Sequence, residues 1–569
     1  MSLVQALQYE LSSQIPRSSF IHQEPPLEPS SGTTPATPAT PNYPNDFQDA
    51  VVDDNAPIPP EMAPRVFDVA PLNVMNKARR VIITSLIIFS NLVQMTVNFV
   101  GVSGGIKLGE ALGVTQAQAT WIGASYALTQ GTFVLISGRL GAVYGHKNLL
   151  LIGGAWLAVC TLACGFSSNF YALTAMRALS GVGGAFILPN AVAMITITNP
   201  PGRMRNLSLA FFGASAPVGG YIGAILLGVF LQVTEWKWLF IFIAALAAAT
   251  FLPLGGILPK EVPVDRDGKI DWVGAGLGTC ALILFNFVWN QAPSVGWSTG
   301  YEIALLVLSV FLFASFIIWE KRFTSHPIMP LDIFKAPSFS ALILVVLLNY
   351  MAVGTLIWYQ ILWLEEAWNW SPLHFAVGWT PFLIFGTGAA GLAAWLIPRL
   401  AAQWILAIGT ITILVSNLLM ATMPPRQTYW AQVFPSVILF AFCPDLVYTA
   451  AQIIASNAVN RHQQGVAGSL IGTLNLYGNS LGLGFAATVE TEIARRTQSS
   501  IMGYRAALYF GAGISVIALV LDLLFVRLVK DEREGWQNAN DMDPADEIEL
   551  TSSAAATGTQ LPAASQRAT

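Results

Sequence analysis

The chain has 569 residues, of which 54% are hydrophobic and only 11% are charged, and its mean hydropathy is +0.57. Soluble domains carry about one charged residue in four, so this composition excludes an ordinary soluble protein. The formal charge of −4 comes largely from acidic terminal segments, whereas the apolar part between them is net basic.

The N-terminal segment, residues 1–75, is rich in Pro, Ser, Thr and Asp. It has too few apolar residues to offset the entropy lost on folding, so we expect a disordered tail. It also lacks a basic stretch followed by an apolar stretch, so we expect no cleaved signal peptide. The last segment, residues 531–569, is acidic and then rich in Ala, Thr and Ser, and we expect a second disordered tail there.

Between these tails, long apolar stretches follow one another. Each has about the 20 residues that a helix needs to cross a bilayer, and none shows the alternation of barrel strands. We therefore predict an all-α polytopic membrane protein with about 14 transmembrane helices. Lys and Arg concentrate in the connections on the side of the tails, which predicts that both termini are cytoplasmic. The expected spans are 81–101, 120–136, 149–166, 171–197, 208–231, 238–258, 272–290, 301–319, 339–364, 375–397, 405–423, 430–455, 466–489 and 506–526.

Among the amide side chains of the first span are Gln94 and Asn98. They are four residues apart and therefore share one face of a helix. An amide can bind a substrate or another helix, but it cannot carry a proton. We expect both side chains to face a substrate cavity.

The connection after the second span reads GRLGAVYGHK over residues 138–147. Its glycines permit a tight turn and a close approach of helices, and its basic residues can bind helix C-termini or carboxylates. We expect this loop to control conformation through Gly138, Arg139, Gly145 and Lys147. The alternative is a basic turn that only fixes the topology.

The fourth span contains Arg177, followed by a run of small residues. A charged side chain inside a membrane is costly unless it faces a partner or water, so Arg177 is a functional candidate. The alternative is that its side chain reaches the outer membrane surface from near the helix start.

Within the fifth span, the segment 217–223 combines one proline with three glycines: Pro217, Gly219, Gly220 and Gly223. Proline removes a backbone hydrogen bond and kinks the helix, while the glycines let another helix pack at backbone distance. We expect a conformational role, although small residues in a membrane helix are more often simple packing sites.

In this order and spacing, the three segments resemble motifs of the major facilitator superfamily. The loop is similar to G-x-x-x-D-R-x-G-R-R/K, the fourth span to R-x-x-x-G-x-G, and the fifth to the antiporter motif G-P-x-x-G-G. The sequence WKWLFIFI at 236–243 is similar to the W-R-W-x-F-x-I opening of the fourteen-span drug:proton antiporter branch. The chain departs from these family motifs at Ala142, Val143 and Ala216, and Gln94 replaces an acid of the first-span motif.

The resemblance covers roughly residues 78–530 and is greatest to fungal aminotriazole-resistance-type exporters. It implies a six-helix bundle at 76–260, two additional helices at 261–322 and a second six-helix bundle at 323–530. It also implies a proton-coupled antiporter in which Arg177 takes part in proton coupling.

One acid stands near the centre of its span, Asp445, with Tyr448 and Gln452 at i+3 and i+7 on about the same helix face. The low polarity at that depth favours the neutral acid, which suits reversible protonation. We interpret Asp445 as a proton site and the two neighbours as cavity residues. The alternative is a structural, hydrogen-bonded acid.

Other polar residues at mid-membrane depth are candidates either for the substrate cavity or for hydrogen bonds between helices. We expect Glu365 and Glu366, at the outer end of a span, to be solvated, and Asp522 to be structural. The candidates are Tyr126, Asn190, Asn349, Tyr350, Asn475 and Asn479.

The sequence lacks a GxxxxGK[ST] loop, which argues against direct use of ATP, and its five histidines lack HExxH spacing. We therefore expect no enzyme activity, no cofactor, no metal and no nucleic-acid partner. Asn369 begins an N-glycosylation sequon in an outer loop that lies close to the membrane.

We predict a transporter that exports small organic compounds, such as drugs, toxins or a secondary metabolite, in exchange for protons. The main alternative, favoured by Gln94 and Ala142, is a facilitator or importer of a small polar solute on the same fold. A more distant alternative is a non-transporting membrane receptor. We expect a monomer, surrounded by membrane lipid, in the plasma membrane, with the vacuolar membrane as the second possibility.

Overall fold

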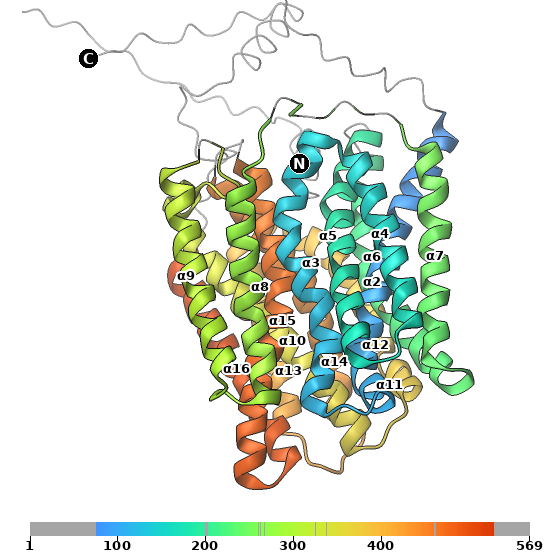
Figure 1. Cartoon of the computed structure of the whole chain (residues 1–569), viewed down its shortest axis with the longest axis vertical. Coiled ribbons are helices and arrows are strands. Elements are labelled where there is room, and N and C mark those ends of the chain that lie inside the picture. Colours follow the sequence, from blue (N-terminus) through green and yellow to red (C-terminus); the bar gives the residue numbers. More distant parts are fainter. Residues whose placement is uncertain are drawn as a thin grey trace, which may run out of the picture.

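The computed structural model describes residues 76–199, 203–259, 261, 263, 265–266, 268–324, 326–336, 338–459 and 463–527. Within these ranges all the regular structure is helical, and the long helices run side by side in one bundle (Figure 1). The two tails that we predict to be disordered, residues 1–75 and 531–569, lie outside the described residues.

The first six long helices pack on one another, and α2 contacts α3, α5, α6 and α7. We call this group the first half. Its members are α2 (Lys77–Ala111), α3 (Gln116–Tyr144), α4 (His146–Phe166), α5 (Phe170–Thr198), α6 (Arg203–Val233) and α7 (Trp236–Ile257).

A helical pair, α8 (Trp272–Val295) and α9 (Gly300–Arg322), follows, and then a second group that we call the second half. In that group α10 contacts α13, α14, α15 and α16. Its members are η2 (Leu331–Lys335), α10 (Phe339–Leu362), η3 (Trp363–Ala367), α11 (Pro372–Gly378), α12 (Thr380–Leu396), α13 (Ala402–Ala421), α14 (Val433–Ala458), α15 (Gln464–Thr497) and α16 (Ser500–Phe525).

With α11 and α12 counted as one span, the described part of the chain contains the fourteen predicted spans, which confirms the predicted fold class. The tenth span is broken at Trp379, because Pro381 in the first turn of α12 has no N–H for a continuous helix. Twelve helices of the described part are long and apolar enough to cross a membrane by composition alone. The two others, α3 and α15, are the more polar members of the bundle.

Both ends of the described chain lie on the same side of the bundle, as an even number of spans requires. Near the start of α2, Arg79 Nη2 donates to Ile257 O at the end of α7 (3.1 Å). Past the end of α16, Arg527 O accepts from Ser338 Oγ at the start of α10 (3.2 Å). We call this side, at the top of Figure 1, the tail face, and the opposite side the far face. At the far face, the end of α15 and the start of α16 extend past the other helices (Figure 1).

The two halves meet along α3 and α15, and also where α6 contacts α11 and α12. Glycine makes the first of these contacts close: a β-carbon at Gly131 of α3 would lie 2.5 Å from the backbone nitrogen of Tyr477 in α15. Nearer the tail face, a β-carbon at Gly138 would lie 3.1 Å from Ser469 Oγ. The small residues of α3 and α15 therefore let the halves approach at backbone distance.

The additional pair is attached to both halves through α8, which contacts α3 and α15. Tyr477 OH of α15 donates to Leu282 O of α8 (2.9 Å), and Trp121 Nε1 of α3 donates to Gln291 Oε1 of α8 (2.8 Å). Thus α8 covers the line along which α3 and α15 meet.

Candidate functional site

Arg139, in the last two turns of α3 before the turn to α4, binds a distant part of the chain. Its Nη1 lies 2.7 Å from Asp265 Oδ2, and its Nη2 donates to Lys269 O (3.2 Å). The backbone N–H of Asp265 donates to Ala142 O (3.0 Å). Ala142 occupies the position of the acid in the family motif, so Asp265 brings a carboxylate to this turn from the segment after α7.

The same segment holds the start of α4. Gly145 has φ of +96°, a left-handed conformation that glycine adopts without strain. The backbone N–H of Lys147 donates to Glu261 Oε1 (3.0 Å), and Lys147 Nζ donates to Leu258 O (2.7 Å). Both basic residues of the 138–147 loop thus bind the segment that leads from α7 to α8.

Asn190 of α5 lies under this turn. Its Oδ1 is 2.8 Å from Nδ1 of His146, and its Nδ2 donates to Ser137 Oγ (3.0 Å) and Phe186 O (2.7 Å). The amide is fully buried among these partners. The structure therefore places Asn190 beside the loop, where it links α3, α4 and α5.

Arg177 of α5 is completely buried, which excludes the alternative that it reaches the membrane surface. Its guanidinium donates to three backbone carbonyls: Ile122 O of α3 (2.5 Å), Val97 O of α2 (3.2 Å) and Asn98 O of α2 (3.3 Å). The Asn98 side chain lies nearby, and its Oδ1 is buried without a hydrogen-bond partner. Arg177 is therefore a fixed charge that joins three helices of the first half.

The space for this guanidinium depends on a glycine. A β-carbon at Gly101 of α2 would overlap the Arg177 guanidinium. The guanidinium carbon also lies 5.8 Å from the ring centre of Tyr126, within range of a cation–π contact. Gly101 and Arg177 are thus a matched pair across α2 and α5.

A buried polar chain runs from α3 through α2 to α6. Gln130 Nε2 donates to Gln94 Oε1 (2.8 Å), and Gln94 Nε2 donates to Asn91 Oδ1 (3.2 Å). Asn91 Nδ2 then donates to Ser215 Oγ (2.8 Å). The Tyr126 hydroxyl donates to the backbone oxygen of Gln94 (3.4 Å). This polar hydrogen-bond chain brings together two predicted residues, Gln94 and Tyr126, and both take part in contacts between helices.

Three members of this polar chain were not predicted from the sequence: Asn91, Gln130 and Ser215. Helical spacing was the signal that could have found the first two, because Asn91 precedes Gln94 by three residues and Gln130 follows Tyr126 by four. Ser215 lies on another helix, so only the packed structure shows its role.

The glycine motif of α6 faces α2. A β-carbon at Gly219 would lie 2.5 Å from Leu92 O, and one at Gly223 would lie 2.8 Å from Thr96 O. Gly220 contacts the same helix. This surface of α6 therefore packs within the first half at backbone distance.

Pro217, in contrast, lies at the boundary between the halves. A β-carbon at Gly386 of α12 would lie 3.1 Å from Cβ of Pro217. One turn further along α6, the hydroxyls of Tyr221 and Thr380 are 3.0 Å apart. The α6 motif thus connects α2 on one side with α12 on the other.

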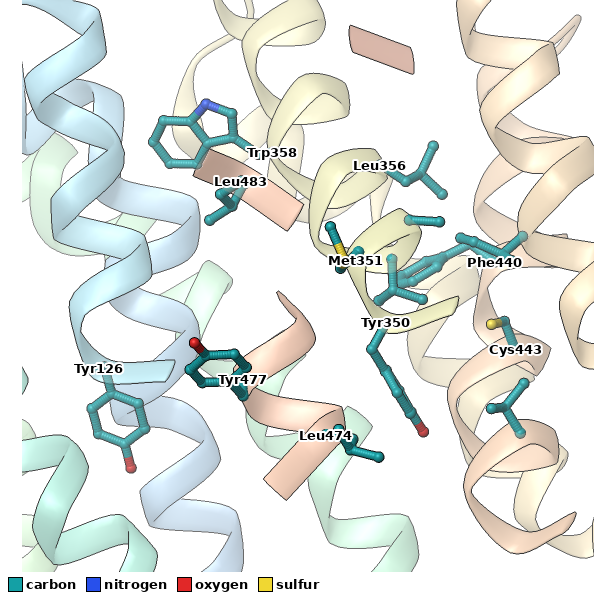
Figure 2. Close-up of a cluster of buried hydrophobic side chains, with 14 of the residues drawn as sticks. Tyr126, Tyr350, Met351, Leu356, Trp358, Phe440, Cys443, Leu474, Tyr477 and Leu483 are labelled. Atoms are coloured by element: carbon teal, nitrogen blue, oxygen red, sulfur yellow. The ribbon is translucent and has the colours of Figure 1, made fainter. Parts of the chain in front are cut away.

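Asp445 is at the midpoint of α14 and is partly exposed. Its carboxylate makes no hydrogen bond or ion pair with the residues that the structure describes. The residues around it are bonded across to α10: Tyr350 OH donates to Pro444 O (3.1 Å), and Asn349 Nδ2 donates to Cys443 Sγ (3.3 Å). Figure 2 shows Tyr350 and Cys443 on these neighbouring helices, and in this view Tyr477 and Leu474 of α15 lie between Tyr350 and Tyr126 of α3.

The other predicted residues of this face of α14 point toward α15. Gln452 Nε2 donates to Gly468 O (3.0 Å). At Gly472 of α15, a β-carbon would lie 3.5 Å from Val134 of α3 and 3.9 Å from the Tyr448 hydroxyl. The face that carries Asp445 is therefore directed at α15, behind which lies the first half.

Asn475 and Asn479 lie one turn apart on α15 and are both partly exposed. Asn479 Nδ2 donates to Asn475 O (2.7 Å), while the buried Oδ1 of Asn479 has no hydrogen-bond partner. A buried amide oxygen without a donor is costly. It is available to a ligand or to water.

Toward the far face, Glu490 of α15 joins the two halves. Gln116 Nε2 of α3 donates to Glu490 Oε1 (3.0 Å), and Tyr359 OH of α10 donates to Glu490 Oε2 (2.9 Å). Tyr504 OH of α16 donates to Gln116 Oε1 (3.3 Å). The two bonds of Gln116 cross between the halves and must break if the halves separate at this end, whereas the Tyr359–Glu490 bond lies within the second half.

A second pair at the far face links α2 to the end of α10, with Lys107 Nζ 3.5 Å from Glu366 Oε1. Its neighbour Glu365 contradicts the expectation of a solvated acid. Only 3% of Glu365 is exposed, and both of its carboxylate oxygens lack hydrogen-bond partners. The π-helical turn at Trp363–Ala367 carries both acids, yet Glu366 is exposed and Glu365 is buried.

Asn369, the first residue of the sequon, follows this turn. It is exposed and has φ of +55°, a left-handed conformation that Asn tolerates better than most residues. Its side chain is thus accessible at the far face.

Comparison with known proteins places these features in a family context. A model of the Major Facilitator Superfamily matches residues 84–483. The chain is 34% identical to the low affinity ammonium transporter of Saccharomyces cerevisiae, over 72% of this chain and 82% of the relative. It is 31% identical to the aminotriazole resistance protein of the same yeast, over 78% and 83% of the two chains.

The chain is also 33% identical to the efflux pump terJ of Aspergillus terreus, over 74% of this chain and 82% of the pump. Among solved structures, a bacterial homolog of the human lysosomal transporter Spinster aligns with a TM-score of 0.55 at 16% identity. That alignment covers 79% of this chain and 97% of the other, and it is a likeness of fold alone.

Proposed function

The chain belongs to the major facilitator superfamily, in its fungal drug-efflux branch, and we propose that it is a proton-coupled antiporter exporting small organic compounds. The observation that carries this proposal is Asp445, an acid without a protein partner at the midpoint of a spanning helix. In the described part of the chain, the other helical acids lie within about two turns of a helix end.

An acid at this depth is suited to bind and release a proton, because the neutral form is favoured there and a carboxylate is costly. Asp445 has no competing hydrogen bond, so a proton or a substrate group can reach it without breaking a structural contact. Its helix face turns toward α15 and the first half, where secondary transporters bind their substrates.

Arg177 supplies the opposite property, a charge that does not titrate. It is held by carbonyls of α2 and α3, and it fixes the helices that carry Gln94 and Tyr126. We assign it a positioning role: it holds α2, α3 and α5 of the first half together, while Asp445 of the second half binds and releases the proton.

The predicted cavity residues near the two sites are amides and tyrosines among apolar groups: Asn98 and Tyr126 near Arg177, and Asn349 and Tyr350 near Asp445. Such a lining suits a moderately hydrophobic organic compound, because a few polar groups orient the ligand and apolar contacts supply affinity. The aminotriazole resistance protein and the efflux pump terJ are the relatives whose names agree with such cargo.

The test is efflux of a panel of labelled hydrophobic toxins from cells that express the protein, with and without a protonophore. We expect protonophore-sensitive efflux, and we expect Asp445→Asn to abolish it because an amide cannot carry the proton. The matched control is Asp332→Asn, an exposed acid paired with Lys335 (2.6 Å) in η2, which should leave efflux unchanged. Efflux that stays protonophore-sensitive in Asp445→Asn contradicts the assignment.

A second candidate is a facilitator or importer of a small polar solute. The low affinity ammonium transporter is a relative of comparable identity, and the polar chain through Gln94 holds an amide where the family motif has an acid. This candidate predicts accumulation of a labelled small polar solute such as methylammonium in expressing cells, and no response of toxin efflux to the protonophore.

For the exporter we propose a monomer in the plasma membrane with the tail face in the cytoplasm, as the distribution of Lys and Arg favours. The substrate would then leave toward the far face, and protons would enter from that side. Fluorescence microscopy of a tagged chain distinguishes the plasma membrane from the vacuole.

A further inference from the structure

At the tail face, away from the contact between the halves, a cavity of about 220 Å³ opens between α13 and α16. Its walls come from the first turn of α13 and the last turn of α16, so it lies at the depth where lipid headgroups meet the end of the bundle. It is lined by Gln403, Trp404, Asp522, Leu523, Val526 and Arg527.

The acid in this cavity has an unusual environment. Asp522 is 1% exposed, and neither of its carboxylate oxygens has a hydrogen-bond partner among the described residues. A buried carboxylate without a partner costs several kcal/mol. Because Asp522 lines a cavity, a ligand that donates hydrogen bonds can remove that cost.

A second cavity, of about 410 Å³, continues from the first along the same two helices. The two share Trp404 and Leu523, and the deeper one reaches Ile411, about 12 Å below Gln403 along α13. All of its lining residues are apolar: Leu400, Trp404, Ala407, Ile408, Ile411, Leu519 and Leu523.

We propose that this groove binds a phospholipid whose headgroup ends in a primary ammonium. The ammonium lies against Asp522, the phosphate against Arg527, and an acyl chain along the apolar cavity between α13 and α16. The order of one buried anion, one exposed cation and a long apolar trough complements the ammonium, the phosphate and the chain of such a lipid.

The number of N–H donors selects this headgroup over its methylated form. A primary ammonium has three donors and can satisfy both oxygens of Asp522, whereas a trimethylammonium has none. A soluble amine would satisfy Asp522 as well, but it would leave the apolar cavity empty. Both cavities are filled only by a membrane lipid, which supplies the ammonium and the acyl chain together.

Native mass spectrometry of the full chain, released from detergent with added lipid, tests the proposal. The probes are phosphatidylethanolamine and phosphatidylcholine with identical dioleoyl chains, and glycerophosphoethanolamine as the soluble amine. For the unmodified protein we expect several-fold higher occupancy by phosphatidylethanolamine than by phosphatidylcholine, and no retention of the soluble amine.

Two variants separate the headgroup from the chain. Asp522→Asn should remove the preference for phosphatidylethanolamine, while the control Asp332→Asn, an exposed acid at the same face, should keep it. Ile408→Trp, which fills the apolar cavity, should lower the occupancy of both lipids and keep their ratio. Since Ile408 is 38% exposed, this variant remains informative even if Asp522→Asn fails to fold.

Equal occupancy by the two lipids in the unmodified protein would overturn the proposal. So would a preference that survives in Asp522→Asn, retention of the soluble amine, or unchanged lipid occupancy in Ile408→Trp. None of these outcomes depends on the direction or cargo of transport.

Discussion

At the scale of single residues, the pair Arg139–Asp265 shows how one charge of the loop motif is replaced. The family motif places an acid inside the loop, and this chain has Ala142 there. Asp265 approaches the same turn from 126 residues away and binds Arg139 at 2.7 Å. The side chains of Arg139 and Asp265 are 34% and 42% exposed, so the pair itself stabilises the fold by less than about 1 kcal/mol.

The pair matters for function if it holds the loop to the segment after α7 during transport. We expect Asp265→Asn to slow efflux while lowering the thermal unfolding midpoint very little. Adding Ala142→Asp, which restores the acid of the motif, should recover the rate, because a carboxylate again reaches Arg139. Efflux rates of the single and double variants measure this.

The exposed loop acid Asp332 again serves as the control, since its partner Lys335 lies within its own short helix. If Asp265→Asn transports at the normal rate, the Arg139–Asp265 contact has no part in the cycle. If Ala142→Asp fails to rescue, the two acids are not equivalent.

The contacts and burial of individual side chains could be predicted from the sequence only in part. Arg177 could be identified from the cost of a charge in a membrane helix, but its three carbonyl partners could not. The burial of Glu365 contradicts the expected solvation, because position near a helix end does not reveal which way a π-helical turn directs a side chain. Contacts such as Gln116–Glu490 join residues 374 apart, and no local pattern encodes them.

At the scale of helices, the spans were largely predictable, because about 20 consecutive apolar residues have few alternatives. The residues at which each helix begins and ends were harder to predict. The helix α2 extends from Lys77 to Ala111, well beyond the expected 81–101, because the added C-terminal turns are buried against neighbouring helices, with Ser103, Ile106 and Leu108 inside the bundle. The helices α3 and α15 are spans whose polar and small residues face each other across the two halves.

The additional helix α8 is predicted to stabilise this contact. Trp289 of α8 stacks on Phe485 of α15, with ring centres 3.5 Å apart and planes within 13°. We expect Trp289→Ala to destabilise the protein by about 2 kcal/mol, because a large packed ring is removed. The midpoint of thermal unfolding in detergent reports the change.

The matched control is Trp272→Ala on the same helix. Trp272 is 60% exposed at the start of α8, so its removal should change the unfolding free energy by less than about 0.5 kcal/mol. Equal effects of the two substitutions would mean that α8 contributes nothing specific to the contact between α3 and α15.

At the scale of the whole molecule, the contacts between the halves near the far face define a closed end. A β-carbon at Gly228 of α6 would lie 2.5 Å from Cα of Leu373 in α11, too close for any side chain, so the two helices meet at backbone distance there. Alternating access requires one end of such a bundle to open as the other closes. We therefore expect Gly228→Ala to slow transport, because its β-carbon would keep α6 and α11 from closing at the far face, and efflux rates measure this.

The matched control is Gly213→Ala on the same helix, where a β-carbon would have no atom within 4 Å. This control should leave transport unchanged. A normal transport rate in Gly228→Ala would show that the contact between α6 and α11 does not limit the cycle.

The number of spans was predicted from the long apolar stretches, and the division into two helical groups with an inserted pair was implied by the resemblance to the family. Where the halves touch did not follow, because that depends on which faces of α3, α6, α12 and α15 carry small residues in three dimensions. The position of Asp445 near the middle of its span could be predicted from the sequence. Its lack of a hydrogen bond to the described residues could not, because that depends on how the helices pack.

The hairpin formed by α15 and α16 has a practical consequence for imaging. It extends past the other helices at the far face, and only Gln498 and Ser499 separate its two helices (Figure 1). Arg495 and Arg496 both bind Glu492, at 2.9 Å and 2.5 Å, and Gln498 has φ of +53°. An antibody fragment raised against this protruding hairpin would therefore bind an exposed site on a 61.2 kDa membrane protein. The same fragment would serve as an orientation marker for electron cryomicroscopy and, applied to intact cells, would report which side of the membrane the hairpin occupies.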